Sequence, residues 1–303
     1  MTKLTDLQQK IADLLPEIQF LFNEPMAKHT SFRIGGPAEV MVFPTNAEEL
    51  KQVLNKTAVL DCNKAILGAG TNILAPDDGL SGIVICLKDN FNGICLENET
   101  QLCVSAGVTM TRAAVFAANN GLSGMEFAHG IPGTVGGGVY MNAGAYGGEI
   151  CQICQCVEVL TQAGEYRRYD ADEMDFSYRH SRLEGSGEIV ISATFHLQPK
   201  PQEEIRRRMQ ELMNKRKASQ PLEFPSAGSA FKRPVGGYAA ALIDGAGLKG
   251  FRIGDAAVSE KHAGFVINMG NATSKDVKEV LTQVAKKVKD SSGIELHPEI
   301  RIW

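Results

Sequence analysis

The sequence predicts a globular protein of the α+β class. Helical periodicity and strand-like alternation both occur along the 303 residues, and the predicted strands gather in blocks instead of alternating strictly with helices. A hydrophobic fraction of 44% with 22% charged residues is typical of a soluble chain with a sizeable core. The length allows one large domain or a few smaller ones.

The first third of the chain predicts a short helix and then a βαβ-like unit. Apolar residues at helical spacing indicate a helix that ends near Pro16. A second helix is expected to begin at Asn46, with Glu49 in a capping-box-like position, and to run to about residue 56. Strands are predicted over residues 39–43, 65–67 and 83–87.

The middle of the chain predicts a mainly antiparallel sheet. Residues 94–107 alternate like a strand, and residues 111–120 form an Ala-rich helix that Gly121 closes. Further strands of the same sheet are expected over residues 151–160, 165–169 and 189–197.

A change of composition near Gln198 predicts a domain boundary. Residues 203–217 beyond it form a highly charged helix with one apolar face. Further helices are expected over residues 239–244 and from Ser274 to Gly293. Strands are predicted over residues 229–231, 251–253 and 265–268, which completes a compact α+β unit of about a hundred residues.

Charge and cysteine content exclude several classes of protein. A net charge of −4 leaves no global positive field, so we expect no nucleic-acid partner and no membrane insertion. The N-terminus lacks the pattern of a signal peptide, and seven scattered cysteines indicate reduced thiols, so we expect a cytoplasmic protein. Cys151, Cys154 and Cys156 could hold a metal or act in redox chemistry, but their segment alternates like a strand and lacks further ligands. We therefore expect no metal.

Two glycine-rich segments are the candidates for a binding site. Residues 121–148 contain ten glycines interleaved with apolar residues, which predicts a folded wall of a site, although a run of tight turns is the alternative. In residues 67–74, LGAGTNIL, two glycines follow a strand, which suits either a phosphate cradle or a tight turn. Neither the dinucleotide fingerprint nor the P-loop motif is present. With free N–H groups and the hydroxyl of Thr134, the two segments could clasp one pyrophosphate, as in a dinucleotide.

Seven motifs, in family order, carry a resemblance to a known family. They are NEPMAKHTSFRIGGPAEVMVFP, LGAGTNIL, GLSGMEFAHGIPGTVGGGVYMNAGAYGGEI, DFSYRHSRL, QPLEFPSAGSAFKRP, GDAAVSEKHAGFVIN and ELHPEIRIW. From about Pro25 to the C-terminus the chain closely resembles the UDP-N-acetylenolpyruvoylglucosamine reductases, the MurB family of peptidoglycan precursor synthesis. The resemblance implies a two-subdomain FAD-binding domain of the para-cresol methylhydroxylase (PCMH) type, followed by an α+β substrate-binding domain.

On this resemblance the chain divides into four parts. They are an N-terminal helical segment (1–24), FAD-binding subdomains 1 (25–87) and 2 (88–198), and a substrate-binding domain (199–303) whose extreme C-terminus returns to the active site. The resemblance also implies that NADPH reduces a noncovalently bound FAD. The reduced flavin then delivers hydride to UDP-N-acetylglucosamine enolpyruvate, and UDP-N-acetylmuramate is formed.

Three motifs place the catalytic residues that the resemblance implies. SYRHS places a catalytic arginine at Arg179, AGSAFKRP a proton-donating serine at Ser229, and HPEIR a catalytic glutamate at Glu299. An arginine suits a carboxylate and the charge that hydride transfer develops on it. From residue type alone, a structural salt bridge, a turn serine and a surface carboxylate are the alternatives.

The remaining site residues also rest on the resemblance. Lys232 is the candidate for the substrate diphosphate, and the chain lacks room after Arg179 for the tyrosine lid loop of the longer class. A noncatalytic nucleotide-binding module and an FAD oxidase linked covalently through His129 are the competing interpretations. The implied cofactor-binding residues are Gly68, Ala69, Gly70, Thr71, Asn72, Thr134, Gly137, Gly144, Arg216 and Arg301.

Overall fold

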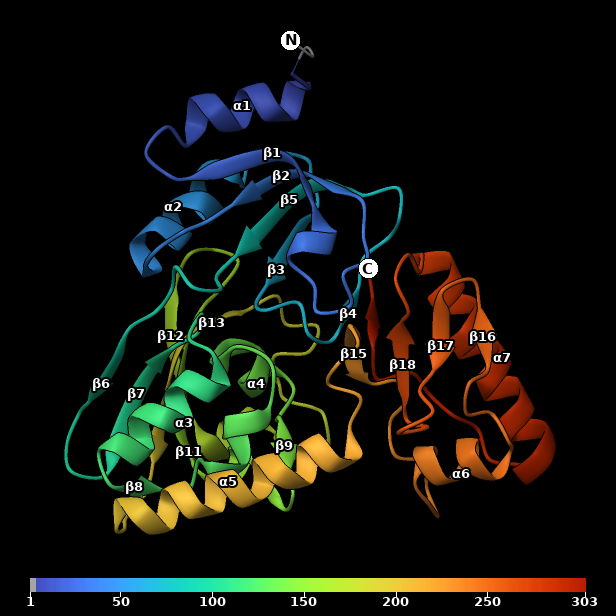
Figure 1. Ribbon diagram of the computed structural model, residues 1–303. Coiled ribbons are helices and arrows are strands. Elements are labelled where there is room, and N and C mark those ends of the chain that lie inside the picture. Colours follow the sequence, from blue (N-terminus) through green and yellow to red (C-terminus); the bar gives the residue numbers. More distant parts are fainter. Residues whose placement is uncertain (1–3) are drawn as a thin grey trace. The chain divides into compact units, whose positions relative to one another are not determined.

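The computed structural model describes residues 4–303 and divides into two compact units (Figure 1). Unit 1 comprises Met1–Phe22, Val40–Ala69 and Gly82–Asn214, of which residues 1–3 lie outside the described part. Unit 2 comprises Asn23–Glu39, Gly70–Ser81 and Lys215–Trp303. Each unit is therefore built from segments that are distant in the sequence, and each contains both helices and strands, as the α+β prediction requires.

The predicted helices of the first third are present. Helix α1 (Asp6–Leu14) ends before Pro16, and Thr5 caps it by accepting a hydrogen bond from Gln8 N. Helix α2 (Ala47–Thr57) begins after Asn46, whose side chain accepts from Glu49 N at 2.9 Å. The Glu49 carboxylate accepts from Thr45 N, one residue earlier than the capping box predicted.

A four-stranded sheet contains the first strands of the chain. Its order is β1-β2-β5-β3, and β3 (Lys64–Leu67) runs parallel to β5 (Leu80–Cys86). The two strands of the predicted βαβ-like unit, which precede and follow α2, are therefore not neighbours, because β5 lies between them. The predicted strand over residues 39–43 is β2 (Pro37–Val42). Strand β1 (Phe20–Pro25), which leads into the 3₁₀ turn η1 (Met26–Lys28), was not predicted.

The five-stranded antiparallel sheet of unit 1 confirms the central prediction. Its order is β12-β11-β13-β7-β6, formed by β12 (Tyr166–Asp170), β11 (Cys154–Leu160), β13 (Ile189–His196), β7 (Gln101–Ser105) and β6 (Ile94–Leu96). The strand predicted over residues 94–107 is a hairpin instead. The Asn98 side chain accepts from the backbone N–H groups of Thr100 and Gln101, which turns the chain.

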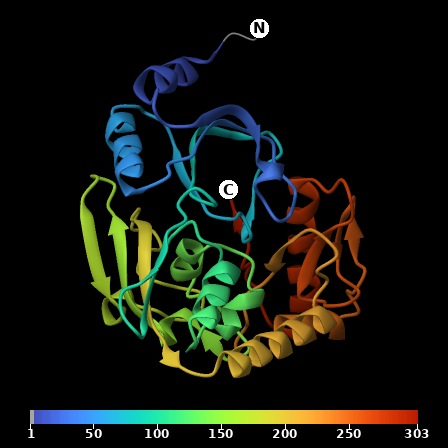
Figure 2. The same ribbon diagram turned by 60° about the vertical axis from the view of Figure 1, so that its left-hand side comes forward.

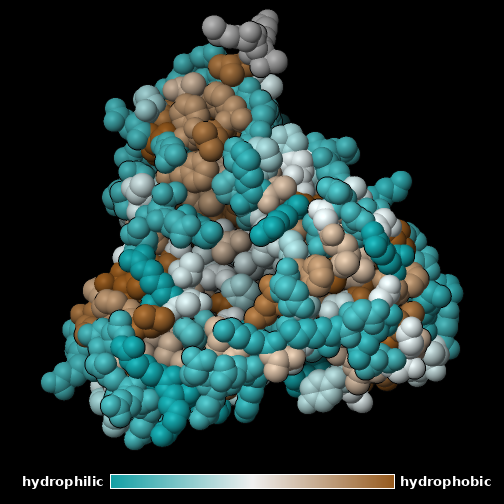
Figure 3. Space-filling view, in the orientation of Figure 1, coloured by the Kyte–Doolittle hydropathy of each residue, from teal (hydrophilic) through white to brown (hydrophobic). Residues whose placement is uncertain are grey.

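Helices cover this sheet and carry the glycine-rich segment. Helix α3 (Met110–Asn119) was predicted, whereas α4 (Val135–Tyr140), which packs on β13 and β7, was not. Helix α5 (Gln202–Ser219) begins beside the end of α3, where Gln202 Nε2 donates to Asn119 O at 2.8 Å (Figures 1 and 2). Ile205, Met209 and Leu212 form its buried face, and its outer face is hydrophilic (Figure 3).

Short elements complete unit 1. They are β8 (Leu122–Ser123) paired with β14 (Gln198–Pro199), the hairpin of β9 (Gly144–Ala145) and β10 (Gly148–Glu149), and the 3₁₀ turns η2 (Glu126–Gly130), η3 (Ile150–Gln152) and η4 (Ala171–Met174). Turn η3 occupies the start of the strand predicted from residue 151.

Unit 2 has its own sheet and core. The sheet order is β15-β18-β17-β16, formed by β15 (Ser226–Ser229), β18 (Phe265–Asn268), β17 (Ala256–Val258) and β16 (Arg252–Ile253). Helices α6 (Ala239–Gly245) and α7 (Ser274–Ser292) were predicted, and α7 ends at Gly293 with φ 72°. The parallel pair of β4 (Ile73–Leu74) and β19 (Arg301–Ile302) joins the C-terminus to the 70–81 segment.

Within residues 4–303, no helix combines the length and the apolar composition that a membrane span requires.

Candidate active site

The two glycine-rich segments meet in unit 1. Gly68 follows β3, and a Cβ added to it would lie 2.5 Å from Thr134 Oγ1. The described residues contain no hydrogen-bond acceptor for the backbone N–H groups of Gly68 and Ala69. This edge of unit 1 therefore offers two free N–H donors beside a threonine hydroxyl, a combination that suits an anion such as a phosphate.

The second glycine-rich segment was predicted to offer free N–H groups, but those at the start of helix α4 donate hydrogen bonds within the protein. Val135 N donates to Val108 O at 2.8 Å, and Gly136 N donates to Ala106 O at 2.9 Å. Gly138 N donates to Thr134 O, while Gly137 N donates over 3.4 Å to Thr134 Oγ1, which caps the helix. The predicted second set of free donors is thus largely used by the protein itself, and the glycines serve close packing against Ala106 and Met110.

The rest of the first glycine loop belongs to unit 2. Gly70 has φ 60°, and a Cβ there would collide with the backbone of His29 and Thr30, so only glycine fits. Its carbonyl accepts from Ser31 N at 3.0 Å. Within the described chain, no acceptor is found for the N–H groups of Gly70 and Asn72.

Unit 2 brings several predicted residues onto neighbouring segments of the chain. Glu299 N donates to Ala230 O at 2.9 Å, so the segment that carries Glu299 lies beside the end of β15, where Ser229 stands. Lys232 N donates to His297 O at 2.8 Å, which extends the same pairing. Ser229 is exposed, and Lys232 and Glu299 are half-buried.

The first glycine loop and the C-terminus join this arrangement. Asn72 Nδ2 donates to Glu299 O at 3.3 Å, and Arg301 N donates to Asn72 O at 2.9 Å. Unit 2 therefore assembles Asn72, Ser229, Lys232, Glu299 and Arg301 within one set of backbone contacts. Thr71 lies in the same loop.

Arg179 belongs to unit 1, where it lies beside Gly144. Its Nη2 donates to Gly144 O at 3.3 Å, and its guanidinium lies 5.1 Å from the centre of the Tyr178 ring. Arg179 adopts φ 56°, a left-handed conformation that is uncommon for a residue with a Cβ and that recurs at functional sites. This backbone conformation is an observation that the sequence did not reveal.

Arg216 is 7% exposed, which is rare for an arginine. Its Nη1 donates to Gln220 Oε1 at 3.1 Å near the end of α5. It belongs to unit 2, so the predicted site residues are divided between the units. Gly68, Ala69, Thr134, Gly137, Gly144 and Arg179 lie in unit 1, and the other predicted residues lie in unit 2.

Asn142 is a buried polar residue near Arg179 that the sequence did not single out. It is 1% exposed, adopts φ 41°, and uses its side-chain amide to bind Glu149, Cys151 and Ser177. An asparagine among glycines could have signalled it, because asparagine tolerates the left-handed conformation and carries both donors and acceptors.

Cys151, Cys154 and Cys156 are the candidates for a metal or redox site, and His129 is the candidate for a covalent flavin link. All seven cysteines are free thiols, and burial raises the pKa of Cys154 to about 12. Among residues 4–303, no group of three or more His, Cys, Asp or Glu side chains is placed to hold a metal. Burial lowers the pKa of the His129 imidazole, whose Nδ1 is enclosed and has no hydrogen-bond partner in the described part of the chain.

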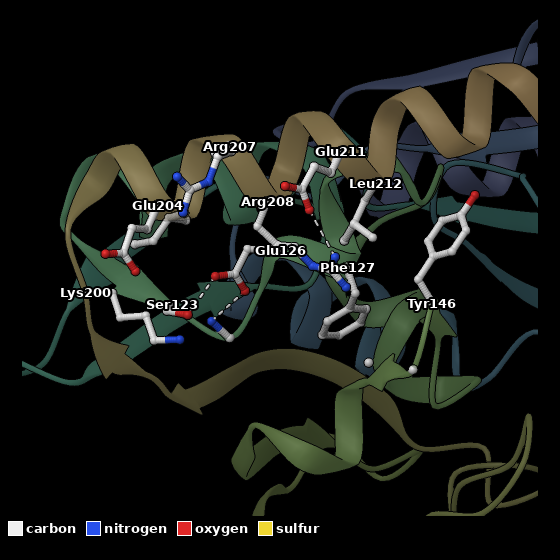
Figure 4. A pocket seen from close by; sticks show the side chains of 14 residues that line it. Ser123, Glu126, Phe127, Tyr146, Lys200, Glu204, Arg207, Arg208, Glu211 and Leu212 are labelled. Atoms are coloured by element: carbon white, nitrogen blue, oxygen red, sulfur yellow. Dashed lines mark hydrogen bonds and ion pairs between the residues drawn. The ribbon is translucent and has the colours of Figure 1, made fainter.

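A separate open groove of about 500 Å³ runs between α5, η2 and the β9–β10 hairpin (Figure 4). Lys200 and Glu204 lie at one end of it and Tyr146 at the other. The Glu126 carboxylate inside it accepts from Ser123 Oγ and Gly124 N. The groove is lined by none of the predicted site residues.

Comparison with known proteins identifies both parts of the chain. An FAD-binding domain model matches residues 38–170, and the C-terminal domain of UDP-N-acetylenolpyruvoylglucosamine reductase matches residues 220–303. The free donors at Gly68 and Ala69, beside Thr134, fit the phosphates of such a cofactor. The fold and the site thus define a flavin-dependent oxidoreductase.

Full-length relatives give the particular family. The UDP-N-acetylenolpyruvoylglucosamine reductase of Lachnoclostridium phytofermentans is 44% identical over 97% of this chain and 96% of its own length. That of Caldanaerobacter subterraneus is 46% identical over 98% of this chain and 97% of its own length. The crystal structure of the MurB reductase from Thermus caldophilus matches with a TM-score of 0.80 and 37% identity, covering 95% of this chain and 99% of that one. The chain belongs to the UDP-N-acetylenolpyruvoylglucosamine reductase (MurB) family.

Proposed function

We propose that this protein uses NADPH to reduce UDP-N-acetylglucosamine enolpyruvate to UDP-N-acetylmuramate. This reaction belongs to peptidoglycan precursor synthesis, on which cell-wall biogenesis, cell shape and cell division depend. The observation that carries the proposal is the pairing of the Glu299 segment with the end of β15. Glu299 N donates to Ala230 O at 2.9 Å, next to Ser229, so two residues implied by separate motifs are neighbours.

The cofactor is held, in this proposal, by backbone donors and a hydroxyl. Gly68 and Ala69 supply N–H groups, and Thr134 supplies Oγ1, which lies against Gly68. Gly70, Thr71, Asn72, Gly137, Gly144, Arg216 and Arg301 complete the proposed set. The chemistry that FAD supplies when bound is hydride transfer, from a nicotinamide to FAD and from FAD to the substrate.

The protein's own side chains act on the substrate. Hydride arriving at the enolpyruvyl methylene carbon pushes charge through C2 into the carboxylate. The Arg179 guanidinium is permanently charged and has a fork geometry that suits this carboxylate. Ser229 Oγ then donates a proton to C2, and Lys232 binds the substrate diphosphate.

Glu299 has a role that depends on its protonation. A carboxylate beside the substrate carboxylate would be repelled, so we propose that Glu299 acts in its protonated or otherwise paired form. Its backbone N–H donates to Ala230 O and its carbonyl accepts from Asn72 Nδ2, so its backbone is held on both sides.

We also propose which function each part of the chain carries out. Residues 25–87 and 88–198 form the two FAD-binding subdomains of the PCMH type, and residues 199–303 bind the substrate. Segment 1–24 contributes packing. The chain is assigned to the shorter class without a tyrosine lid and to the cytoplasm, and the free thiols of all seven cysteines support that location.

The proposal is tested by following the flavin spectrum without oxygen. FAD-loaded protein is mixed with NADPH, and UDP-N-acetylglucosamine enolpyruvate is then added. The proposal requires bleaching by NADPH, followed by full recovery of the oxidised spectrum with the substrate. A colourless protein after reconstitution with FAD, or a reduced protein that the enolpyruvyl substrate does not reoxidise, would refute it.

A further inference from the structure

Asn142, which follows helix α4, joins three segments of unit 1 through one side chain. Its Oδ1 accepts from Cys151 N at 2.9 Å. Its Nδ2 donates both hydrogens, to Glu149 Oε2 at 3.0 Å and to Ser177 O at 3.0 Å. The side chain is 1% exposed, so both ends of a buried amide are satisfied by protein groups.

The bond to Ser177 fixes the backbone that carries Arg179. Ser177 and His180 exchange two backbone hydrogen bonds of 3.2 Å, which leaves Tyr178 and Arg179 at the tip of a tight turn. Asn142 therefore holds the base of this turn. The left-handed φ of 56° at Arg179 is unfavourable and persists only where the surroundings impose it.

The hydrogen bond from Asn142 to Glu149 holds the hairpin whose carbonyl group accepts a hydrogen bond from the Arg179 guanidinium. Glu149 is the register partner of Gly144 in the β9–β10 hairpin. Gly144 O accepts from Arg179 Nη2 at 3.3 Å. The contacts thus form a closed ring from Asn142 through Ser177, Arg179, Gly144 and Glu149 back to Asn142.

A second bond holds the other side of the turn. Ser181, which is fully buried, donates from its Oγ to Tyr140 O at 2.8 Å, at the end of α4. Residues 177 and 181 are thus both attached to the segment 140–142. The turn is fastened on either side of Arg179.

A purely local role does not account for this network. Asparagine tolerates the φ of 41° that Asn142 adopts, which explains the residue type but not its partners. Each of the two Nδ2 hydrogen bonds holds a group that positions Arg179. One holds the backbone at Ser177, and the other holds Glu149, the register partner of Gly144, whose carbonyl accepts from the Arg179 guanidinium. An arginine loses much side-chain freedom when it is ordered, so a preformed position lowers the cost of binding a carboxylate.

We propose that Asn142 is a positioning residue for Arg179, and that Ser181 supports it. The inference rests on the proposed role of Arg179 in the reductase. Asn142 does not contact the substrate in this account. It sets the place and orientation of the guanidinium, and its loss lowers turnover only through Arg179.

The test compares Asn142→Ala, Arg179→Ala and the double variant as FAD-loaded proteins. Misplacing a catalytic group by about 1 Å costs up to roughly a hundredfold in rate, so we expect Asn142→Ala to lower turnover about ten- to hundredfold. The double variant should be no slower than Arg179→Ala alone, because the arginine that Asn142 positions is already absent. If Asn142→Ala does not fold, Ser181→Ala takes its place in the comparison. We then expect a smaller loss of turnover, and no further loss when Ser181→Ala is combined with Arg179→Ala.

Thr57→Val is the matched control. Thr57 is fully buried in α2, and its Oγ1 donates to Val53 O at 2.6 Å, so the variant also loses a buried hydrogen bond. We expect it to lower the melting temperature but to keep turnover within about twofold of the unchanged protein. A loss of turnover in both variants would assign the effect of Asn142→Ala to stability and overturn the inference.

Hydrogen exchange gives a readout that does not depend on activity. The N–H groups of Cys151 and His180 should exchange faster in Asn142→Ala and at the original rate in Thr57→Val. Unchanged exchange, or rate losses that multiply in the double variant, would overturn the inference. A large effect of Arg179→Ala with none of Asn142→Ala would overturn the inference and leave the proposed function standing, whereas no effect of Arg179→Ala would overturn both.

Discussion

Gly68 lies so close to the hydroxyl of Thr134 that a Cβ on the glycine would be 2.5 Å from Thr134 Oγ1. These residues come from the two glycine-rich segments of the chain, and unit 1 brings them into contact. A pyrophosphate clasp requires this proximity. The contact also makes residue 68 a position where a single methyl group has a large effect.

Gly68→Ala is expected to weaken FAD binding about tenfold and to destabilise the protein by about 1–3 kcal/mol, because overpacking forces neighbouring atoms apart. Thr134→Ala in the same chain removes the clashing oxygen and should restore part of the stability. The control is Gly237→Ala, since no atom of residues 4–303 outside its chain neighbours lies within 4 Å of a Cβ at that position. Quenching of FAD fluorescence and thermal unfolding measure both effects, and unchanged FAD affinity in Gly68→Ala would contradict the account.

Lys232→Met should raise the KM for the enolpyruvyl substrate about tenfold or more, because a charged partner of the diphosphate is lost. The KM for NADPH should not change. Lys289→Met, at the end of α7, is the control, since this exposed lysine forms a surface ion pair with Glu295 at 3.5 Å. Equal changes of both KM values in Lys232→Met would argue against a diphosphate contact.

Asp77→Asn should destabilise unit 2 by about 1 kcal/mol, which is typical of a lost helix cap. The Asp77 carboxylate accepts from Ser274 N at 2.7 Å and from Lys275 N at 3.1 Å, and so caps α7 from a distant segment. Asp78→Asn is the neighbouring control. Urea unfolding provides the measurement, and equal midpoints for the two variants would show that the cap contributes nothing.

The buried thiol of Cys154 should make the folded protein less stable at high pH. Burial raises its pKa from 9.0 to about 12, so the folded protein keeps a proton that the unfolded chain releases above pH 9. The stabilisation is complete below pH 9 and is lost as the pH rises towards 12, by up to about 1.4 kcal/mol per pH unit. Urea unfolding between pH 8 and 10.5 should show a shallower decline for Cys154→Ala than for the unchanged chain, and parallel curves would contradict the assignment.

Most elements could be predicted because their signals are local. Apolar periodicity and the cap at Gly293 located α7, and alternation located β11, β12 and β13. Helix α4 was missed because VGGGVY has little intrinsic helix propensity, and its packing against Ala106 and Met110 stabilises it instead. Such a tertiary effect leaves no periodic signal.

The site was predicted only as far as motifs reach. The resemblance proposes Arg179, Ser229 and Glu299 as catalytic residues, but the left-handed backbone of Arg179 and the network of Asn142 depend on contacts between distant segments. The expected free donors of α4 were wrong for the same reason, because Val108 and Ala106 accept from Val135 and Gly136. Hydrogen-bond satisfaction is a property of the fold and is not readable from spacing.

The central claim is that Ser229 protonates the substrate carbon after hydride transfer, and single-turnover kinetics of Ser229→Ala test it most directly. NADPH should bleach the flavin of this variant at the rate of the unchanged protein. Reoxidation by the enolpyruvyl substrate should then be slower by roughly 10²–10⁴-fold, the usual contribution of a general acid. Reoxidation at the original rate would contradict the account, and so would slow bleaching by NADPH, because Ser229 would then act before the substrate is reduced.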